Sequence, residues 1–207
     1  ATDVVKRLGR TLVLRRLGCS FESGAIHFLR GANGSGKSTL LSILGGRLPA
    51  DQGQVTLKFD ESQPVCGAEV RRHIGWLGHD LGLYGELTVG ENLALHGSLA
   101  GSRVSGPGDL AVWGLEGLWT RRARDLSRGQ RQKVALARLL LREPRVVLMD
   151  EPSTALDPAA VRTLAGLLQR LADEGRVVVV ASHDEALMSA SPASQRWTLR
   201  VGQLTAG

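Results

Sequence analysis

Two uninterrupted apolar runs stand out in the pattern of polar and apolar positions along the chain, at Val146–Met149 and Val177–Ala181. A strand without polar alternation is typical of a parallel sheet that helices cover on both faces. Between the runs, apolar residues recur at helical spacing; Asp157 and Pro158 favour a helix N-cap and first turn, and Gly175 favours a helix end. The pattern therefore predicts a strand–helix–strand unit in the middle of a mostly parallel sheet.

Shorter apolar segments predict further elements nearer the N-terminus. Ala25–Leu29 has the composition of a strand and leads directly into a glycine-rich turn. After the turn, the density of apolar residues predicts a helix over Ser38–Leu48, which Pro49 ends. The polar and apolar positions of Val55–Phe59 alternate, so we expect a strand there and another at His73–Leu77.

The stretch 79–128 differs from the rest of the chain. It holds helical candidates at Val89–Leu99 and Asp109–Trp113, separated by the Gly/Ser/Pro-rich segment Gly101–Gly108. Strand signals are missing from it. We therefore expect this stretch to form a helical insertion.

The composition favours a soluble globular protein. Of the 207 residues, 43% are hydrophobic and 22% charged, and no apolar stretch approaches the roughly 18 residues that a membrane-spanning helix needs. The first residues carry charges and do not resemble a secretory signal, so we expect a cytoplasmic protein. Cys19 and Cys66 are too few for a disulfide framework and lack metal-ligand spacing, so we expect both to be reduced and structural.

The net charge of the chain is +6, which favours anionic partners without naming one. The basic residues are scattered and only 4% of the residues are aromatic, so a face that stacks single-stranded nucleic acid is not indicated. We expect no nucleic-acid partner.

A glycine-rich loop between a strand and a helix carries the strongest chemical signal. Its pattern is G-x-x-x-x-G-K-[ST], and it comprises Gly31, Ala32, Asn33, Gly34, Ser35, Gly36, Lys37 and Ser38, followed by Thr39. In such a loop the backbone N–H groups point at phosphate oxygens, Lys37 supplies positive charge, and Ser38 offers a hydroxyl to Mg²⁺. Thr39 can donate to a neighbouring phosphate. A glycine-rich turn that binds nothing is the alternative, and the flanking strand and helix argue against it.

Two adjacent carboxylates follow the first long apolar run, at the kind of strand end where ligands gather in an open parallel sheet. We expect Asp150 to hold Mg²⁺ through water, and Glu151 to orient and deprotonate the water that attacks the γ-phosphate. An exposed acidic turn is the alternative. His183 follows the second long run, where an imidazole can reach the γ-phosphate, although a His at a strand end is more often a satisfied structural group.

A polar segment, Leu126–Gln130, precedes a helix that we predict over Arg131–Leu141, with Pro144 ending it. The hydroxyl of Ser127 and the free N–H groups of a helix N-terminus form a second candidate anion site. An ordinary helix N-cap also explains this serine.

The order of these motifs resembles that of the ATP-binding-cassette (ABC) ATPases, whose signature reads L-S-G-G-Q where this chain has Leu126–Gln130. The resemblance covers nearly the whole chain. It implies an α/β fold of the P-loop NTPase kind, with a mostly parallel core sheet, an antiparallel N-terminal β subdomain and an inserted helical subdomain. The single domain of residues 1–207 then divides into a nucleotide-binding core, 1–78 and 129–207, and an insertion, 79–128.

The resemblance also implies cofactors, partners and a location. In the family, ATP and Mg²⁺ are bound between two head-to-tail copies, so Ser127, Arg128, Gly129 and Gln130 of one copy are expected to complete the nucleotide site of the other. Asp157 matches the family's D-loop, which implies an interface role besides capping. Such a pair powers transport through separate integral membrane subunits. The implied location is cytoplasmic, peripheral on the inner face of the cell membrane.

Three positions depart from the usual pattern of the family. His79 lies where a Gln usually contacts Mg²⁺ or water and links to the membrane partner, and an imidazole would make that contact sensitive to pH. No aromatic residue lies near Leu8, where one usually stacks on adenine, so base recognition is expected to be loose or to use aliphatic packing and Arg7. Arg128 replaces the first glycine of the signature, with its side chain expected to point away from phosphate.

Within the family, the compact length, the Leu-Gly-His sequence ending at His79 and the missing adenine aromatic resemble the ATP-binding subunits of haem exporters used in cytochrome c maturation. Other ABC-2-type exporters, for drugs, lipids or polysaccharides, are the alternative, because Leu81–Asn92 is similar to their cassettes. A non-transport cassette acting on DNA or ribosomes fits less well, since no coiled-coil insertion or basic tail is present. A P-loop kinase gives no reason for Ser127 and Gln130.

Overall fold

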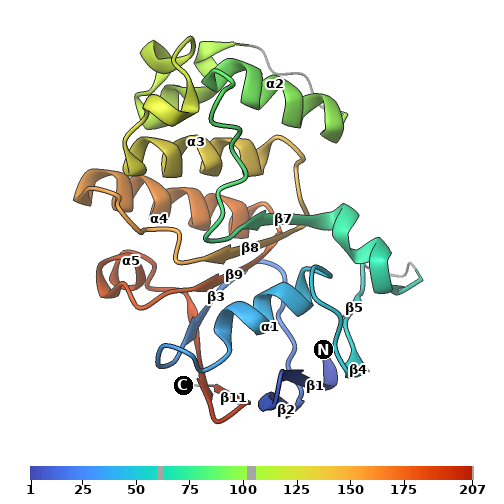
Figure 1. Ribbon diagram of the computed structural model, residues 1–207. Helices are drawn as coiled ribbons and strands as arrows, with labels where there is room; N and C mark the ends of the chain where they lie inside the picture. Colours follow the sequence, from blue (N-terminus) through green and yellow to red (C-terminus); the bar gives the residue numbers. More distant parts are fainter. Residues whose placement is uncertain (60–62, 102–105, 207) are drawn as a thin grey trace.

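A six-stranded sheet forms the centre of the computed structural model, which describes residues 1–59, 63–101 and 106–206 (Figure 1). Its strand order is β11-β10-β3-β9-β8-β7. The strands are β3 (Ala25–Arg30), β7 (Ile74–Leu77), β8 (Val146–Asp150), β9 (Val177–Ala181), β10 (Gln195–Arg200) and β11 (Gln203–Ala206). All neighbouring strands are parallel except β10 and β11, which are antiparallel. The prediction of a mostly parallel sheet is confirmed.

Two smaller antiparallel sheets accompany the central one. The first has the order β2-β1-β4, with β1 at Thr2–Leu8, β2 at Thr11–Leu17 and β4 at Gln52–Gln54. The second pairs β5 (Thr56–Leu57) with β6 (Val65–Cys66). The expected antiparallel N-terminal region is therefore present, although it also contains a first strand, β1, that the apolar pattern did not predict.

Helices cover both faces of the central sheet (Figure 1). The α-helices are α1 (Lys37–Leu44), α2 (Val89–Ala100), α3 (Arg128–Leu140), α4 (Pro158–Asp173) and α5 (Glu185–Ser189). Short 3₁₀ helices are η1 (Gly67–His73), η2 (Pro107–Trp113), η3 (Glu116–Leu118) and η4 (Ala123–Asp125). None of the helices in the described residues has the length and hydropathy that a membrane span requires.

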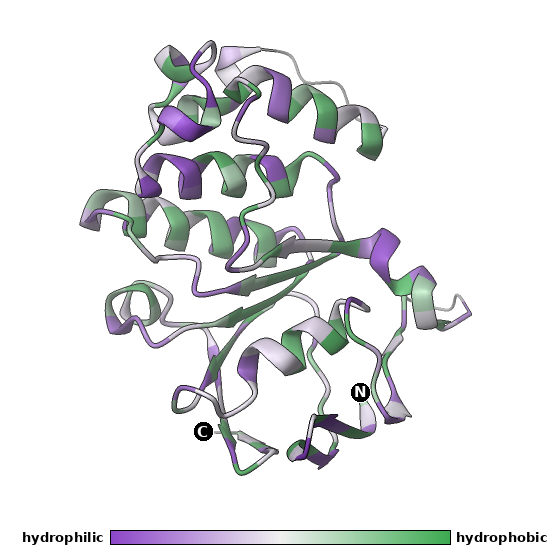
Figure 2. Cartoon of the chain, in the orientation of Figure 1, coloured by the Kyte–Doolittle hydropathy of each residue, from purple (hydrophilic) through white to green (hydrophobic). Residues whose placement is uncertain are grey.

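The two faces of the sheet belong to two hydrophobic cores, because successive strand residues point to opposite sides. Val147 and Met149 of β8 pack in one core with α2, α3 and α4, whereas Val146 and Leu148 pack in the other with α1 and the β1–β2 hairpin. Figure 2 shows hydrophobic colouring along the central strands. Leu164 of α4 is fully buried, and burial of such a side chain contributes about 1.5–3 kcal/mol.

Several predicted boundaries are wrong. The helix expected over Ser38–Leu48 ends at Leu44, because Gly45 and Gly46 follow and Gly46 adopts a left-handed φ of 64°. The strand expected at Val55–Phe59 is reduced to two residues.

The helical region also differs from its prediction in detail. Asp109–Trp113 lies in a 3₁₀ helix rather than an α-helix, and α3 begins at Arg128 instead of Arg131 because Ser127 is its N-cap. Residues 102–105 of the predicted Gly101–Gly108 connection lie outside the described residues.

Candidate functional site

The glycine-rich loop leaves the end of β3 and enters α1 without a side-chain cap. Its N-cap residue is Gly36, with a left-handed φ of 105°, and in the described residues no side-chain hydrogen bond caps the helix. A Cβ at Gly36 would lie 2.8 Å from Val13 Cγ1, and one at Gly31 would lie 2.5 Å from Leu199 O. Only glycine fits these two positions, and the amides at the start of α1 are left to a ligand.

Lys37 is buried and folds back onto the loop. Its Nζ donates hydrogen bonds to the carbonyl oxygens of Gly31 (2.7 Å) and Ala32 (3.2 Å). Ser38 is exposed and Thr39 is half-buried. The hydroxyl of Ser35 is buried and has no hydrogen-bond partner in the described residues. The loop therefore holds a positive charge and an unsatisfied hydroxyl together, which suits an anionic ligand.

Two carboxylates lie at the end of β8, each beside a histidine. Asp150 is 4% exposed, and its Oδ2 lies 3.5 Å from Nε2 of His79. Glu151 Oε1 lies 2.9 Å from Nδ1 of His183. Both imidazoles are exposed, while both carboxylates are largely buried. The acidic pair is thus not a solvated turn, because each carboxylate has a defined partner.

Backbone contacts between neighbouring strands position Glu151 and His183. The N–H of Glu151 donates to the carbonyl oxygen of Ala181 (2.8 Å), and Glu151 has a left-handed φ of 49°. Ser182 is fully buried, its N–H donates to Leu29 O (3.3 Å), and its Oγ accepts from Asp184 N (3.1 Å). The segment around His183 is therefore fixed while the imidazole itself faces solvent.

Ser127 is the N-cap of α3. Its Oγ accepts a hydrogen bond from Gln130 N (3.2 Å), and Gln130 Oε1 accepts one from Ser127 N (3.0 Å). This reciprocal capping box confirms the capping interpretation of the serine. The side chains of Ser127 and Arg128 are exposed. A Cβ at Gly129 would lie 2.5 Å from Ala155 O, so the first turn of α3 touches the segment that follows Glu151.

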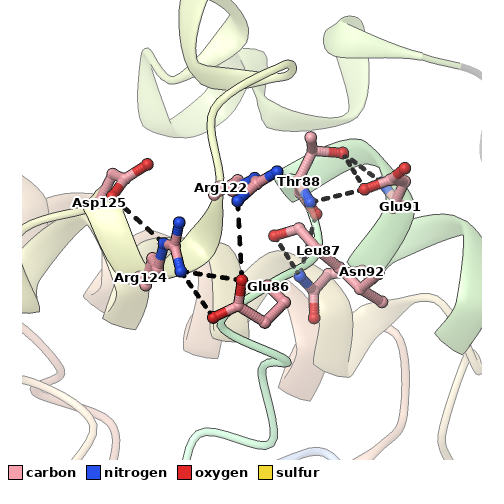
Figure 3. A network of polar contacts seen from close by, with 8 residues as sticks. All are labelled: Glu86, Leu87, Thr88, Glu91, Asn92, Arg122, Arg124 and Asp125. Carbon is pink, nitrogen blue, oxygen red and sulfur yellow. Dashed lines mark hydrogen bonds and ion pairs between the residues drawn. The ribbon is translucent and has the colours of Figure 1, made fainter.

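Ion pairs fix the segment just before Ser127 (Figure 3). The carboxylate of Glu86 accepts two hydrogen bonds from Arg124 Nη1 (2.8 and 2.9 Å) and lies 3.6 Å from Arg122 Nη1. Ala123 N also donates to Leu87 O (2.9 Å). The segment that carries the signature is thereby fastened to the start of α2.

Asp157 connects α3 with α4. Its Oδ1 caps α4 by accepting from Ala160 N (2.8 Å), and its Oδ2 lies 3.1 Å from Lys133 Nζ on α3. The Ala160 amide, followed by Lys133, lowers the pKa of Asp157 below its ordinary value. The predicted capping role is confirmed.

The parallel strands bring one set of predicted residues together. Asp150 ends β8, and Lys37 and His183 follow the carboxyl ends of β3 and β9, at the same edge of the sheet, where His79 follows β7. Ser127 belongs to the helical layer on the face opposite α1. One chain therefore presents two candidate anion sites on separate layers.

Sequence reasoning missed two supporting contacts. Gln132 is buried in α3, and its Nε2 donates to Pro152 O (2.8 Å), next to Glu151. A polar residue on an otherwise apolar helix face is the signal that points to it. Arg30, just before the loop, forms an ion pair with Glu185 at the start of α5; nothing in the local pattern links two positions so far apart.

Comparisons with known proteins agree with this geometry. A family profile described as "ABC transporter" matches residues 14–154. The chain is 36% identical to the cytochrome c biogenesis ATP-binding export protein CcmA of Nitrosomonas europaea, over 87% of this chain and 86% of that protein. It is 42% identical to the thiamine import ATP-binding protein ThiQ of a Jannaschia species, over 78% of this chain and 72% of that protein. A dimeric ATP-binding cassette solved with ADP and Pi is 27% identical, with a TM-score of 0.85 over 100% of this chain and 96% of that one.

Proposed function

Because the chain belongs to the ABC transporter family, as a subunit that binds and hydrolyses ATP, we propose that it powers haem export for cytochrome c maturation through separate membrane subunits. The observation that carries this proposal is the similarity to CcmA, which extends over most of both chains. The Leu-Gly-His sequence ending at His79, beside the buried Asp150, supports it. The proposed location is cytoplasmic, on the inner face of the membrane that holds those subunits.

Hydrolysis is assigned to the strand-end pair of Glu151 and His183. Glu151 is the general base: its carboxylate orients the attacking water and accepts its proton. His183 holds the carboxylate of Glu151 through Nδ1 and is placed to contact the γ-phosphate. Lys37 exchanges its two carbonyl partners for phosphate oxygens when ATP binds.

The residues present fit a magnesium ion. Mg²⁺ prefers oxygen ligands and keeps several waters, so it is bound through one or two protein oxygens plus the substrate phosphates. The exposed hydroxyl of Ser38 and the carboxylate of Asp150 are such oxygens, with Asp150 acting through water. In the described residues no group of three or more His, Cys, Asp or Glu side chains is placed for a metal. Bound there, it neutralises phosphate charge.

Two copies of the chain are proposed to pair head to tail around ATP. The phosphate loop and Ser127 lie on opposite layers of one chain, so a second copy is the natural source of residues 127–130 for each loop. The similar cassette solved with ADP and Pi is dimeric, which supports this arrangement. Asp157 lies at the same junction of α3 and α4 and is proposed to contact the second copy.

Haem export is tested by deleting the chain from its host and measuring covalently attached haem in c-type cytochromes. We expect the haem signal to be lost, to return with the wild-type chain, and to stay absent with Glu151→Gln. The matched control is Glu143→Gln, which changes an exposed glutamate outside the strand-end site and is expected to restore the signal. Normal cytochrome levels in the deletion strain, with loss of drug, lipid or polysaccharide export, would favour the alternative ABC-2-type exporter. Loss of thiamine uptake instead would indicate the importer role of the second relative.

A further inference from the structure

The turn that carries His183 is anchored to the end of β3 on both sides of the histidine. Before His183, the N–H of Ser182 donates to Leu29 O (3.3 Å). After it, the carboxylate of Glu185 forms a hydrogen-bonded ion pair with Nη2 of Arg30. Two consecutive residues of one strand therefore hold both ends of the turn, and the position of the imidazole depends on β3 as well as on its own strand, β9.

The same end of β3 also anchors the lysine of the phosphate loop. Arg30 is followed directly by Gly31, whose carbonyl oxygen accepts a hydrogen bond from Lys37 Nζ (2.7 Å). Arg30 thus lies between the ammonium group that is proposed to bind phosphate and the turn that carries His183. A contact at this residue can set the distance between the two groups.

The helix that follows the turn is too short to fix its own first residues. α5 comprises only Glu185–Ser189, and so short a helix is not stable alone in water. Leu187 and Met188 are fully buried and hold its middle. In the part of the chain that the structure describes, the Arg30 ion pair is the one side-chain hydrogen bond that joins the first turn of α5 to another element.

The exposure of this ion pair indicates what it contributes. The side chains of Arg30 and Glu185 are 39% and 62% exposed, and such pairs add little to folding stability. Catalysis is more sensitive than stability, because a displacement of about 1 Å in a reacting group can slow a reaction by as much as about 10²-fold. The pair is therefore expected to affect the rate of hydrolysis rather than the fold.

We propose that Arg30 and Glu185 are positioning residues for ATP hydrolysis, whose ion pair fixes His183 relative to the phosphate loop. The inference rests on the proposed role of His183 at the γ-phosphate. Neither side chain of the pair touches the nucleotide. Both act through His183, which in turn holds the carboxylate of Glu151 through Nδ1 (2.9 Å).

Steady-state kinetics of the full chain test the proposal. Arg30→Ala is expected to lower kcat for ATP by about five- to tenfold, with KM and the equilibrium affinity for ATP changed by less than about twofold. Glu185→Ala is expected to do the same, and the double variant to be no slower than either single one, because all three lack one shared contact. The matched control is Arg200→Ala, which removes an exposed arginine at the end of β10, the strand next to β3, and is expected to keep the wild-type kcat.

Two further measurements separate positioning from a general effect on the fold. In the His183→Ala background, Arg30→Ala is expected to change kcat by less than about twofold. In the nucleotide-free chain, the NMR signal of the His183 ring, identified by its absence from His183→Ala, is expected to shift in Arg30→Ala and to stay in place in Arg200→Ala. The midpoint of urea unfolding is expected to be nearly the same in Arg30→Ala and Arg200→Ala.

A wild-type kcat in Arg30→Ala would overturn the inference. So would a loss of rate that persists in full in the His183→Ala background, or a raised KM with unchanged kcat, since Arg30 would then act on the nucleotide itself. If His183→Ala hydrolyses ATP at the wild-type rate, the proposed role of His183 fails and the inference fails with it. A slow His183→Ala beside a fast Arg30→Ala would reject the inference alone.

Discussion

The N-termini of α1 and α3 are both able to hold an anion, yet they are built in opposite ways. At α1 the N-cap is Gly36, which offers no side chain to the first turn, and Lys37 has folded back onto its own loop. At α3, Ser127 and Gln130 satisfy each other's backbone donors. The first turn of α1 has no side-chain cap, whereas at α3 the capping box already satisfies two backbone donors.

Under the proposed pairing, this difference explains how one chain can bind nucleotide alone and still need a second copy. The open end at α1 gains hydrogen bonds when phosphate enters, so it favours binding by a single chain. At α3 the Ser127 hydroxyl accepts the hydrogen bond from Gln130 N and still has a proton to donate, so under the proposed pairing it contributes to phosphate binding only when two chains meet. The following variants test the N-termini of α1 and α3 separately.

Glu151→Gln has the largest expected effect, because it removes the proton acceptor while leaving the open end of α1 intact. We expect hydrolysis to slow by about 10²–10⁴-fold and ATP affinity to change little. Phosphate release and equilibrium nucleotide binding measure the two quantities. Glu143→Gln is the control, and hydrolysis at the wild-type rate would remove Glu151 from the role of base.

Lys37→Ala removes the buried ammonium group at the uncapped N-terminus of α1. A hydrogen bond to a charged group contributes about 1.5–3 kcal/mol, so ATP affinity is expected to fall by roughly 10–150-fold. Titration with a fluorescent ATP analogue measures it. Lys58→Ala, at an exposed position, is expected to bind as the wild type does. Equal affinity of the two variants would show that the buried ammonium of Lys37 is not used for phosphate.

Gly129→Ala disturbs the contact between the capped end and the segment after Glu151. The added Cβ would lie 2.5 Å from Ala155 O, and such overpacking costs about 1–3 kcal/mol in the free energy of unfolding. Gly166→Ala in α4 is the matched control, because its Cβ meets nothing within 4 Å. It is expected to stabilise the helix by about 0.5–1 kcal/mol. Urea unfolding compares them, and equal stabilities would mean that the first turn of α3 does not touch residue 155 in solution.

Ser127→Ala and Ser127→Asn separate capping from pairing. Loss of the cap in the alanine variant is expected to cost about 1 kcal/mol in the free energy of unfolding, whereas asparagine caps as well as serine. In the Glu151→Gln background, ATP-driven pairing measured by light scattering is expected to weaken in both variants, since both lack the hydroxyl. Full pairing by the asparagine variant would show that Ser127 caps α3 and has no further role in pairing.

The smallest effect is expected from the pH dependence of stability at another capped helix, α4, whose N-cap is Asp157. Hydrogen bonds from Ala160 and Lys133 lower the pKa of Asp157 in the folded chain. The ionised Asp157 therefore adds to the free energy of unfolding at pH values above the ordinary Asp pKa of about 4. This stabilisation is lost as the pH falls through the lower pKa that Asp157 has in the folded chain. Unfolding of the wild type and Asp157→Asn should differ near neutral pH and converge in acid. A difference that is constant with pH would contradict this.

The central sheet and the positions of its strand-end residues can be predicted from the sequence because both depend on local pattern. Uninterrupted β-branched runs indicate buried strands, and Asp150, Glu151 and His183 follow them directly. The β10–β11 hairpin and β1 cannot be predicted in this way. Their alternation is irregular, with buried residues only at Val4, Lys6 and Leu199, and partners far away in sequence determine their pairing.

Contacts between segments that are distant along the chain cannot be predicted from the sequence either. Glu86 meets Arg124 only because the chain returns across α2. Ser127 could be recognised from the sequence as a cap or as an anion site, and the structure adds the reciprocal capping box with Gln130.

The left-handed backbone of Glu151, with φ at 49°, carries a cost that a glycine would not bear. This glutamate is held there by the amide that donates to Ala181 and by its pairing with His183. Selection for thermal stability alone would favour residues that relieve the strain in this turn, and the chain would then lose ATP hydrolysis. The fold thus carries backbone strain at the residue that is proposed to activate water, and a population evolving without need of the transporter would be expected to lose that residue early.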